Sequence, residues 1–129
     1  MTNVSEKNQI FRCNICGNIV ETVNVGGAEL VCCGQPMEFL VAKTEDQGME
    51  KHIPVVEKIE NGILVKIGEM AHPMQQQHYI QWIEILLKNG ESCRKYLNHG
   101  DAPEAIFKID ESQIEGVREY CNVHGLWKK

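Results

Sequence analysis

Four cysteines near the N-terminus have the spacing of a metal site. Cys13 and Cys16 form a C-x2-C pair, which lets two thiolates reach one ion, and Gly17 has the freedom of φ that such a turn often needs. The partner pair, Cys32 and Cys33, follows after 15 intervening residues. A tetrahedral set of four sulfurs suits zinc and iron equally well. The spacing therefore predicts a four-cysteine metal centre and leaves the metal open.

The second cysteine pair is adjacent, whereas zinc ribbons and ordinary rubredoxin-type sites use another C-x2-C pair. Neighbouring residues of an extended chain point to opposite faces. Cys32 and Cys33 can therefore reach one ion only where the backbone is bent, and we expect a distorted tetrahedron of sulfurs. A disulfide is the weaker alternative because it needs an oxidising compartment. Residues 1–8 lack the apolar segment of a signal peptide, so a reducing cytoplasm is the expected location.

A second set of ligands combines histidines with one cysteine. His52, His72 and His78 precede a C-x2-H pair, Cys121 and His124. Neutral imidazoles with one thiolate suit zinc, copper or iron. Five protein ligands are too many for a closed tetrahedral zinc site and fit a square pyramid with one open position. Such a position calls for a metal that activates a small molecule, and the ligand types alone carry the interpretation no further.

Short apolar runs separated by turn residues predict that β-strands position these ligands. Turn signals recur roughly every 8–12 residues, which is typical of an antiparallel sandwich or a small barrel. Asn61-Gly62 is the strongest hairpin signal. A run at 19–25 before Gly26-Gly27 predicts another hairpin. The remaining expected strands are 53–60, 63–67, 79–87, 93–97, 105–109 and 117–121.

The uneven distribution of ligands divides the chain of 129 residues into two expected domains. Residues 1–38 hold four of the six cysteines and are too few for an adequate apolar core, so a metal is the expected staple. Residues 39–129 hold all five histidines and form the larger β domain. The net charge of −5 disfavours nucleic acid as a partner. No apolar run approaches the roughly 20 residues that span a bilayer, so no membrane partner is expected.

Taken in order, these residues resemble the desulfoferrodoxin family, the two-iron class of superoxide reductases, over nearly the whole chain. The four cysteines match the small desulforedoxin-like module with its adjacent cysteine pair. The histidine and cysteine segments match the catalytic iron domain of that family. These segments are 50–54 (Glu-Lys-His-Ile-Pro), 72–74 (His-Pro-Met), 78 (His) and 121–127 (Cys-Asn-Val-His-Gly-Leu-Trp).

The resemblance implies an all-β fold, in which a desulforedoxin-like iron module precedes an immunoglobulin-like antiparallel β-sandwich. It implies one iron on the four cysteines, where zinc is the alternative, and a second iron in the sandwich. The ligands of the second iron are four histidines in a plane and one axial cysteine: His52, His72, His78, His124 and Cys121. The position opposite Cys121 is vacant in the reduced state, Glu50 occupies it in the ferric state, and Lys51 lies beside it. Cys93 and His99 match no ligand of the family and receive no metal role.

The resemblance also implies the reaction: one-electron reduction of superoxide to hydrogen peroxide, without release of dioxygen. Glu50 and Lys51 are the expected catalytic residues, because the charge of Lys51 attracts an anion and its ammonium group can deliver a proton through water. The expected partners are a rubredoxin-type electron donor and a second copy in a homodimer. The alternatives are a rubredoxin-like electron carrier that works through the four cysteines, a zinc-stapled binding module and a superoxide dismutase.

Overall fold

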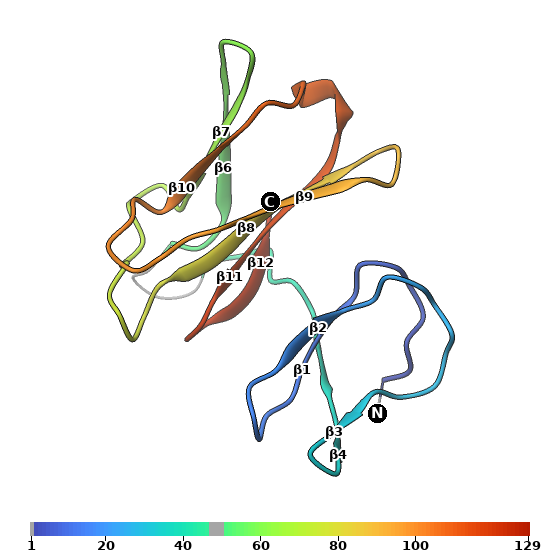
Figure 1. Cartoon of the computed structure of the whole chain (residues 1–129). Coiled ribbons are helices and arrows are strands. Elements are labelled where there is room, and N and C mark those ends of the chain that lie inside the picture. The colour runs from blue at the N-terminus through green and yellow to red at the C-terminus, as the bar shows by residue number, and fades with distance from the viewer. Residues whose placement is uncertain (1, 47–50) are drawn as a thin grey trace. The chain divides into compact units, whose positions relative to one another are not determined.

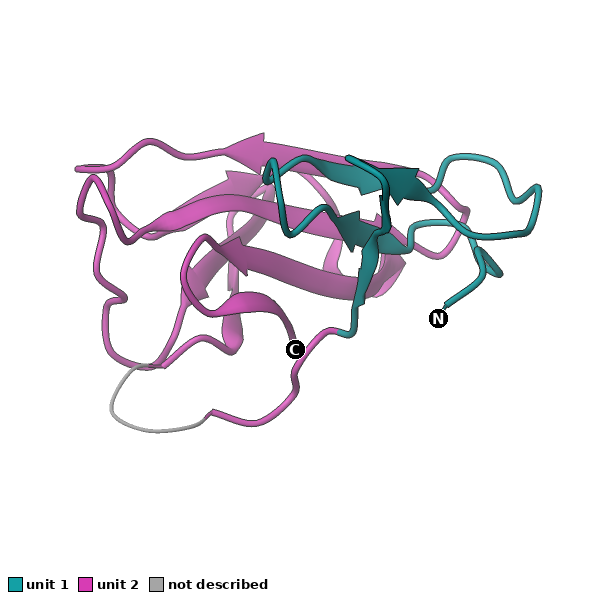
Figure 2. Cartoon of the chain, turned by 90° about the horizontal axis from the view of Figure 1, so that it is seen from below, with its two compact units in different colours: residues 1–41 teal, residues 42–129 magenta. Residues whose placement is uncertain are grey.

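Two groups of β-strands make up the chain, and the computed structural model describes residues 2–46 and 51–129. The strands divide into two compact units, Met1–Val41 and Ala42–Lys129 (Figure 1, Figure 2). Within the described ranges the helical content is a single 3₁₀ turn, η1 (Glu111–Gln113). No helix in those ranges has the length and apolar character that a membrane crossing requires. The predicted all-β fold is confirmed.

The small unit consists of a three-stranded antiparallel sheet and a short hairpin. Its core is formed by the buried side chains of Val4, Phe11, Cys13 and Met37, a set small enough that a metal staple is expected. The sheet has the order β2-β1-β5, and the hairpin pairs β3 with β4. The strands are β1 (Ile10–Arg12), β2 (Ile19–Glu21), β3 (Val31–Cys32), β4 (Gln35–Pro36) and β5 (Glu38–Leu40).

The hairpin predicted at Gly26-Gly27 is wrong. Strand β2 ends at Glu21 and pairs with β1, which precedes it in the chain. The connecting turn is therefore the C-x2-C segment itself, where Cys13 N donates to Asn18 O at 2.8 Å and Gly17 N donates to Cys13 O at 2.9 Å. Gly17 has the expected positive φ, 82°. The cysteine turn thus serves both as a metal-binding loop and as the hairpin connection.

The large unit is a sandwich of two antiparallel sheets with seven strands. In chain order, the first, second and fifth strands form one sheet, and the third, fourth, sixth and seventh form the other (Figure 1). This is an immunoglobulin-like arrangement in which the fourth strand has joined the second sheet. One sheet, of order β10-β7-β6, contains β6 (Pro54–Ile59), β7 (Gly62–Ile67) and β10 (Glu104–Phe107). The other, of order β12-β11-β8-β9, contains β8 (Ile80–Leu87), β9 (Ser92–Tyr96), β11 (Ile114–Cys121) and β12 (Gly125–Lys128).

The six strands predicted after residue 52 are confirmed, since each predicted run overlaps an observed strand. The hairpin at Asn61-Gly62 is also confirmed: it joins β6 to β7, with Asn61 at a φ of 65°. Strand β12 was not predicted. Its four residues are too few to show the alternation of apolar and polar residues that identifies a strand.

A bulge in β8 determines which residues face the interior of the sandwich. Strict alternation would place Ile80 and Ile83 on opposite faces, yet both are fully buried in the core. The pairing with β11 shifts between Tyr120 and Cys121, which leaves Gln81 as an extra residue in β8. The shift turns the start of β8 toward the core, so Ile80 lies opposite Cys121.

Candidate metal centres

The structure brings the four cysteines of the small unit together. Their Sγ atoms all lie within 4.8 Å of one another, with Cys32 Sγ 3.6 Å from that of Cys16 and 3.9 Å from that of Cys33. The expected bend is confirmed: Cys33 and Gly34 form the tip of the β3–β4 hairpin, with φ of 53° and 75°. Two residues with positive φ are typical of a type I′ turn. The turn therefore brings the adjacent thiols to one side.

Backbone amides favour a thiolate at Cys13. Hydrogen bonds from the N–H groups of Cys16 and Ile15 lower the pKa of Cys13 to about 6. Hydrogen bonding with the thiol of Cys16, and next with Cys13, raises the pKa of Cys32 to about 12. A metal ion that binds four thiolates here must therefore displace protons. The donor set, one amide-stabilised sulfur with three close neighbours, fits an iron or a zinc ion.

Four imidazoles form a closed ring in the large unit. Between successive histidines, in the order His52, His72, His78, His124 and back to His52, the ring centroids lie 4.6, 5.0, 5.1 and 5.0 Å apart. Neighbouring ring planes are inclined by 60° to 88°. Each imidazole is thus steeply tilted against the next, and the ring nitrogens can surround one centre.

The distances between ligand atoms fit one metal ion. The Sγ of Cys121 lies 3.6 Å from His72 Nε2, and the five ligand atoms all lie within 4.8 Å of one another. His52 Nε2 and His72 Nε2 are 3.0 Å apart. Two nitrogens bonded at about 2.1 Å lie about 3.0 Å apart at a right angle and about 3.4 Å apart at the tetrahedral angle. The observed separation fits a right angle between these two ligands better than it fits the tetrahedral angle of a structural zinc site.

The five ligands come from strand ends at one end of the sandwich. His52 precedes β6 and His72 follows β7, which is antiparallel to β6. His78 precedes β8, Cys121 ends the antiparallel strand β11, and His124 lies in the turn to β12. Two histidines thus come from each sheet, and the packing of the sheets closes the ring. The ligands are therefore held by a rigid scaffold.

Burial and hydrogen bonding keep the imidazoles ready to bind a metal. His72 Nδ1 lies 2.7 Å from the carbonyl oxygen of Pro73. Because a carbonyl oxygen only accepts hydrogen bonds, Nδ1 carries the hydrogen. The other ring nitrogen of His72, Nε2, therefore carries the lone pair that can bind a metal. His52 is 2% exposed. Burial, followed by the neighbouring His72 and His124, lowers the pKa of His52 to about 4. His52 is therefore neutral at pH 7, the form that coordinates a metal.

Asn122 joins the cysteine turn to the segment that carries His78. Its side-chain Oδ1 accepts a hydrogen bond from Tyr79 N at 2.9 Å, and its Nδ2 donates to Gln77 O at 3.1 Å. Its backbone N donates to Tyr79 O at 3.3 Å. One amide side chain thus holds the residues on both sides of His78. Sequence reasoning missed this role, for which the only signal was the position of Asn122 between two predicted ligands.

Two carboxyl groups that sequence reasoning also missed lie near the ligands. Asp46 Oδ1 accepts hydrogen bonds from the backbone N of His52 at 2.7 Å and of Ile53 at 3.3 Å. Glu119 is fully buried, two residues before Cys121, and neither of its oxygens has a hydrogen-bond partner among the described residues. Burial, with a smaller contribution from Asp46, raises the pKa of Glu119 well above its usual value. Burial therefore disfavours a negative charge at Glu119, two residues from Cys121.

The two predicted catalytic residues precede His52. Glu50 lies outside the described residues, and Lys51 is half-buried. Gly68, at a φ of 80°, lies against the backbone of Lys51, and a Cβ at this position would lie 2.8 Å from Lys51 Cβ. Since real Cβ contacts are essentially never that close, Gly68 allows the chain to pass beside Lys51.

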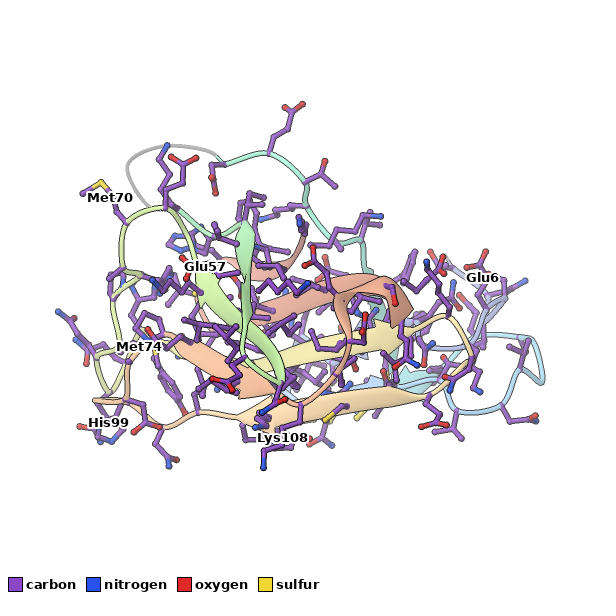
Figure 3. All side chains as sticks on the ribbon, turned by 90° about the horizontal axis from the view of Figure 1, so that it is seen from above. Glu6, Glu57, Met70, Met74, His99 and Lys108 are labelled. Carbon is purple, nitrogen blue, oxygen red and sulfur yellow. The ribbon has the colours of Figure 1, made fainter. Side chains whose placement is uncertain are left out.

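Cys93 and His99 lie apart from both ligand groups. Cys93 packs against the core of the sandwich. His99 is exposed on the outside of the large unit, with its ring centroid 6.1 Å from that of Tyr79 (Figure 3).

Comparison with known proteins covers both units. The N-terminal domain of desulfoferrodoxin matches residues 5–40, and the domain described as desulfoferrodoxin matches residues 44–129. The chain belongs to the desulfoferrodoxin family. Its relatives include the desulfoferrodoxin homolog of Methanothermobacter thermautotrophicus, which is 57% identical over 96% of this chain and 99% of that protein. The desulfoferrodoxin of Syntrophotalea carbinolica is 52% identical, over 96% and 97% of the two chains.

One solved structure with a similar fold is that of an oxidoreductase. The superoxide reductase from Treponema pallidum superposes with a TM-score of 0.74 and is 30% identical, over 94% of this chain and 96% of that chain. This match extends through both units of the desulfoferrodoxin fold. The family and this structural likeness support an oxidoreductase activity for the chain.

We expect Asn122→Ala to weaken metal binding at the histidine centre, because both residues that flank His78 lose a hydrogen bond. Loss of such an outer partner typically lowers metal affinity about 10- to 100-fold. Metal titration followed by absorption measures the effect, and the four-cysteine centre should bind as before. Asn122→Asp keeps the oxygen that accepts from Tyr79 N, so its metal affinity should fall less than that of Asn122→Ala. Equal affinity in Asn122→Ala and the parent protein would contradict this role.

The stability of the metal-free protein should fall as the pH is lowered from about 6.5 toward 4. Over this window the unfolded chain binds a proton at His52 that the folded chain does not, because the folded pKa is about 4. Urea unfolding at pH 7 and pH 5, followed by the fluorescence of Trp82 and Trp127 in the large unit, measures the change. His52→Gln should show a smaller pH dependence. A free energy of unfolding that is the same at both pH values would show that His52 is not neutralised by burial.

Proposed function

We propose that this desulfoferrodoxin is a superoxide reductase. In this proposal superoxide, one electron and two protons give hydrogen peroxide at a ferrous ion held by the four histidines and Cys121. The observation that carries the proposal is the closed ring of four imidazoles with one thiol beside it. Five protein ligands leave one position of an octahedron for a small substrate. The superoxide reductase from Treponema pallidum, with its similar fold, supports the same assignment.

An iron ion in this centre would supply one electron to superoxide by direct contact. The residues of the chain decide what can reach it. An ion here would be held by four imidazoles, which carry no negative charge, and by the thiolate of Cys121, and burial disfavours a negative charge at Glu119. An anionic substrate therefore meets little repulsion from the ligands.

Lys51 is proposed to guide the substrate and to help protonate the product. Its charge offsets the overall −5 of the chain near His52 and attracts an anion. The ammonium group of this half-buried residue, which precedes the ligand His52 in the chain, can also orient water or pass a proton to the peroxide. Glu50 is proposed as the sixth ligand of the ferric state, which would protect the resting centre from other anions.

The four-cysteine centre is proposed to relay electrons. Its four protein ligands leave no vacant position, so substrate chemistry there is not expected. Iron suits this role, and zinc remains the alternative metal. A rubredoxin-type protein is the proposed external donor, and the proposed assembly is a homodimer in a reducing cytoplasm.

The proposed reaction predicts its stoichiometry. A pulse of superoxide on the fully reduced protein should oxidise one iron and release one hydrogen peroxide per superoxide, with no dioxygen. Cys32→Ser should disturb the four-cysteine centre and leave this single turnover largely intact. Dioxygen release without iron oxidation would indicate a dismutase. Loss of the reaction in Cys32→Ser, with the histidine centre still loaded, would make the four-cysteine centre the working site.

Replacing Lys51 by Met should lower the second-order rate constant for superoxide about 10-fold at low ionic strength, because a guiding positive charge is lost. Lys51→Arg should retain most of the rate. Lys58→Met, which removes an exposed lysine of β6, is the matched control. Pulse radiolysis at several salt concentrations measures these rates. If the rate constant fell equally in Lys51→Met and Lys58→Met, the effect would arise from the net charge of the protein and not from the position of Lys51.

A further inference from the structure

Trp127 links two of the four histidines to a surface lysine. Its indole ring is stacked on the imidazole of His52, with centroids 4.4 Å apart and planes inclined by 9°. Its Nε1–H donates to the carbonyl oxygen of His124 at 3.2 Å. The ammonium group of Lys43 lies 4.9 Å from the centre of the indole and donates to the same carbonyl oxygen at 2.9 Å. The indole therefore contacts both ligand residues, and the cation contacts the indole and His124.

Backbone hydrogen bonds hold Lys43 at this place. Lys43 forms a bridge with Trp127, its N donates to Leu126 O at 2.9 Å, and its O accepts from Lys128 N at 2.9 Å. Trp127 is 2% exposed, whereas Lys43 is exposed. An exposed lysine side chain ordinarily samples many rotamers, but here the strand pairing, the indole and the carbonyl restrict it. Its charge is thus fixed beside the ligand residues.

We propose that Lys43 and Trp127 are positioning residues of the histidine centre. Trp127 sets the tilt of His52 and anchors the turn that carries His124. Lys43 adds a fixed positive charge, which favours the more reduced state of a metal ion because that state carries less positive charge. The role in tuning a one-electron centre rests on the proposed function, whereas the contacts themselves do not depend on it.

The large unit contains a matched control for Lys43. Lys95 is also exposed, its ammonium group lies 5.2 Å from the ring centre of Phe107, and it donates to the carbonyl oxygen of Ile106. Lys95 therefore makes the same two kinds of contact. Neither Phe107 nor Ile106 belongs to a ligand group. A difference between the two lysines would arise from their neighbours and not from their charge or exposure.

The test is the midpoint potential of the histidine-bound iron, measured by spectroelectrochemistry on the iron-loaded protein. Lys43→Met should lower this potential, whereas Lys43→Arg and Lys95→Met should leave it unchanged. An unchanged potential in Lys43→Met, or an equal shift in Lys95→Met, would overturn the role of Lys43. No superoxide is used, so failure of the parent protein to reduce superoxide would reject the proposed function and leave this result standing.

The role of Trp127 is tested by cobalt(II) titration of the metal-free protein. Trp127→Phe keeps an aromatic ring over His52 and loses the donor to His124 O, so its affinity should fall several-fold. Trp127→Leu loses both contacts, so its affinity for cobalt should fall further, about 10- to 100-fold. Lys43→Met keeps the indole and its donor to His124 O and loses only the second donor, so its affinity for cobalt should fall no further than that of Trp127→Phe. Parent-like affinity in Trp127→Phe, a substitution small enough to fold, would overturn the positioning role of the indole N–H.

Discussion

The separation of 3.0 Å between the Nε2 atoms of His52 and His72 is the constraint on which the large unit depends. Two unprotonated nitrogens at this distance repel each other unless a cation or a proton lies between them. The sandwich enforces the approach, because β6 and β7 pair along their whole length and hold the two histidines at adjacent strand ends. The second sheet then supplies His78, His124 and Cys121 to the same end. The site is thus a product of sheet packing.

The two centres differ in electrostatics because their surroundings differ. In the small unit, backbone N–H groups favour a thiolate at Cys13, and the four sulfurs close the site. In the large unit, burial disfavours the charged forms of His52 and Glu119. A closed set of sulfurs suits the storage of an electron. A nearly neutral set with five ligands suits the approach of an anion.

The members of both groups could be named from the sequence: the four cysteines by their local spacing, and the histidines and Cys121 with the help of the family resemblance. The same holds for the bend at Cys33, which follows from the geometry of adjacent residues. The positioning residues could not be found in this way. Asn122 lies 43 residues from Tyr79 and Lys43 lies 81 residues from His124, so their contacts exist only after the strands have paired. The hairpin at Gly26-Gly27 was mispredicted because a glycine pair signals a turn but does not identify its partner strands.

The most direct test of this account is X-ray absorption at the iron edge of the Cys32→Ser protein loaded with one iron in the histidine centre. We expect four nitrogen ligands at about 2.1 Å and a single sulfur at about 2.3 Å, with any further ligand being oxygen. This result would place the four imidazoles and Cys121 on one ion. Two or more sulfurs, or a tetrahedral set of four ligands in all, would contradict it.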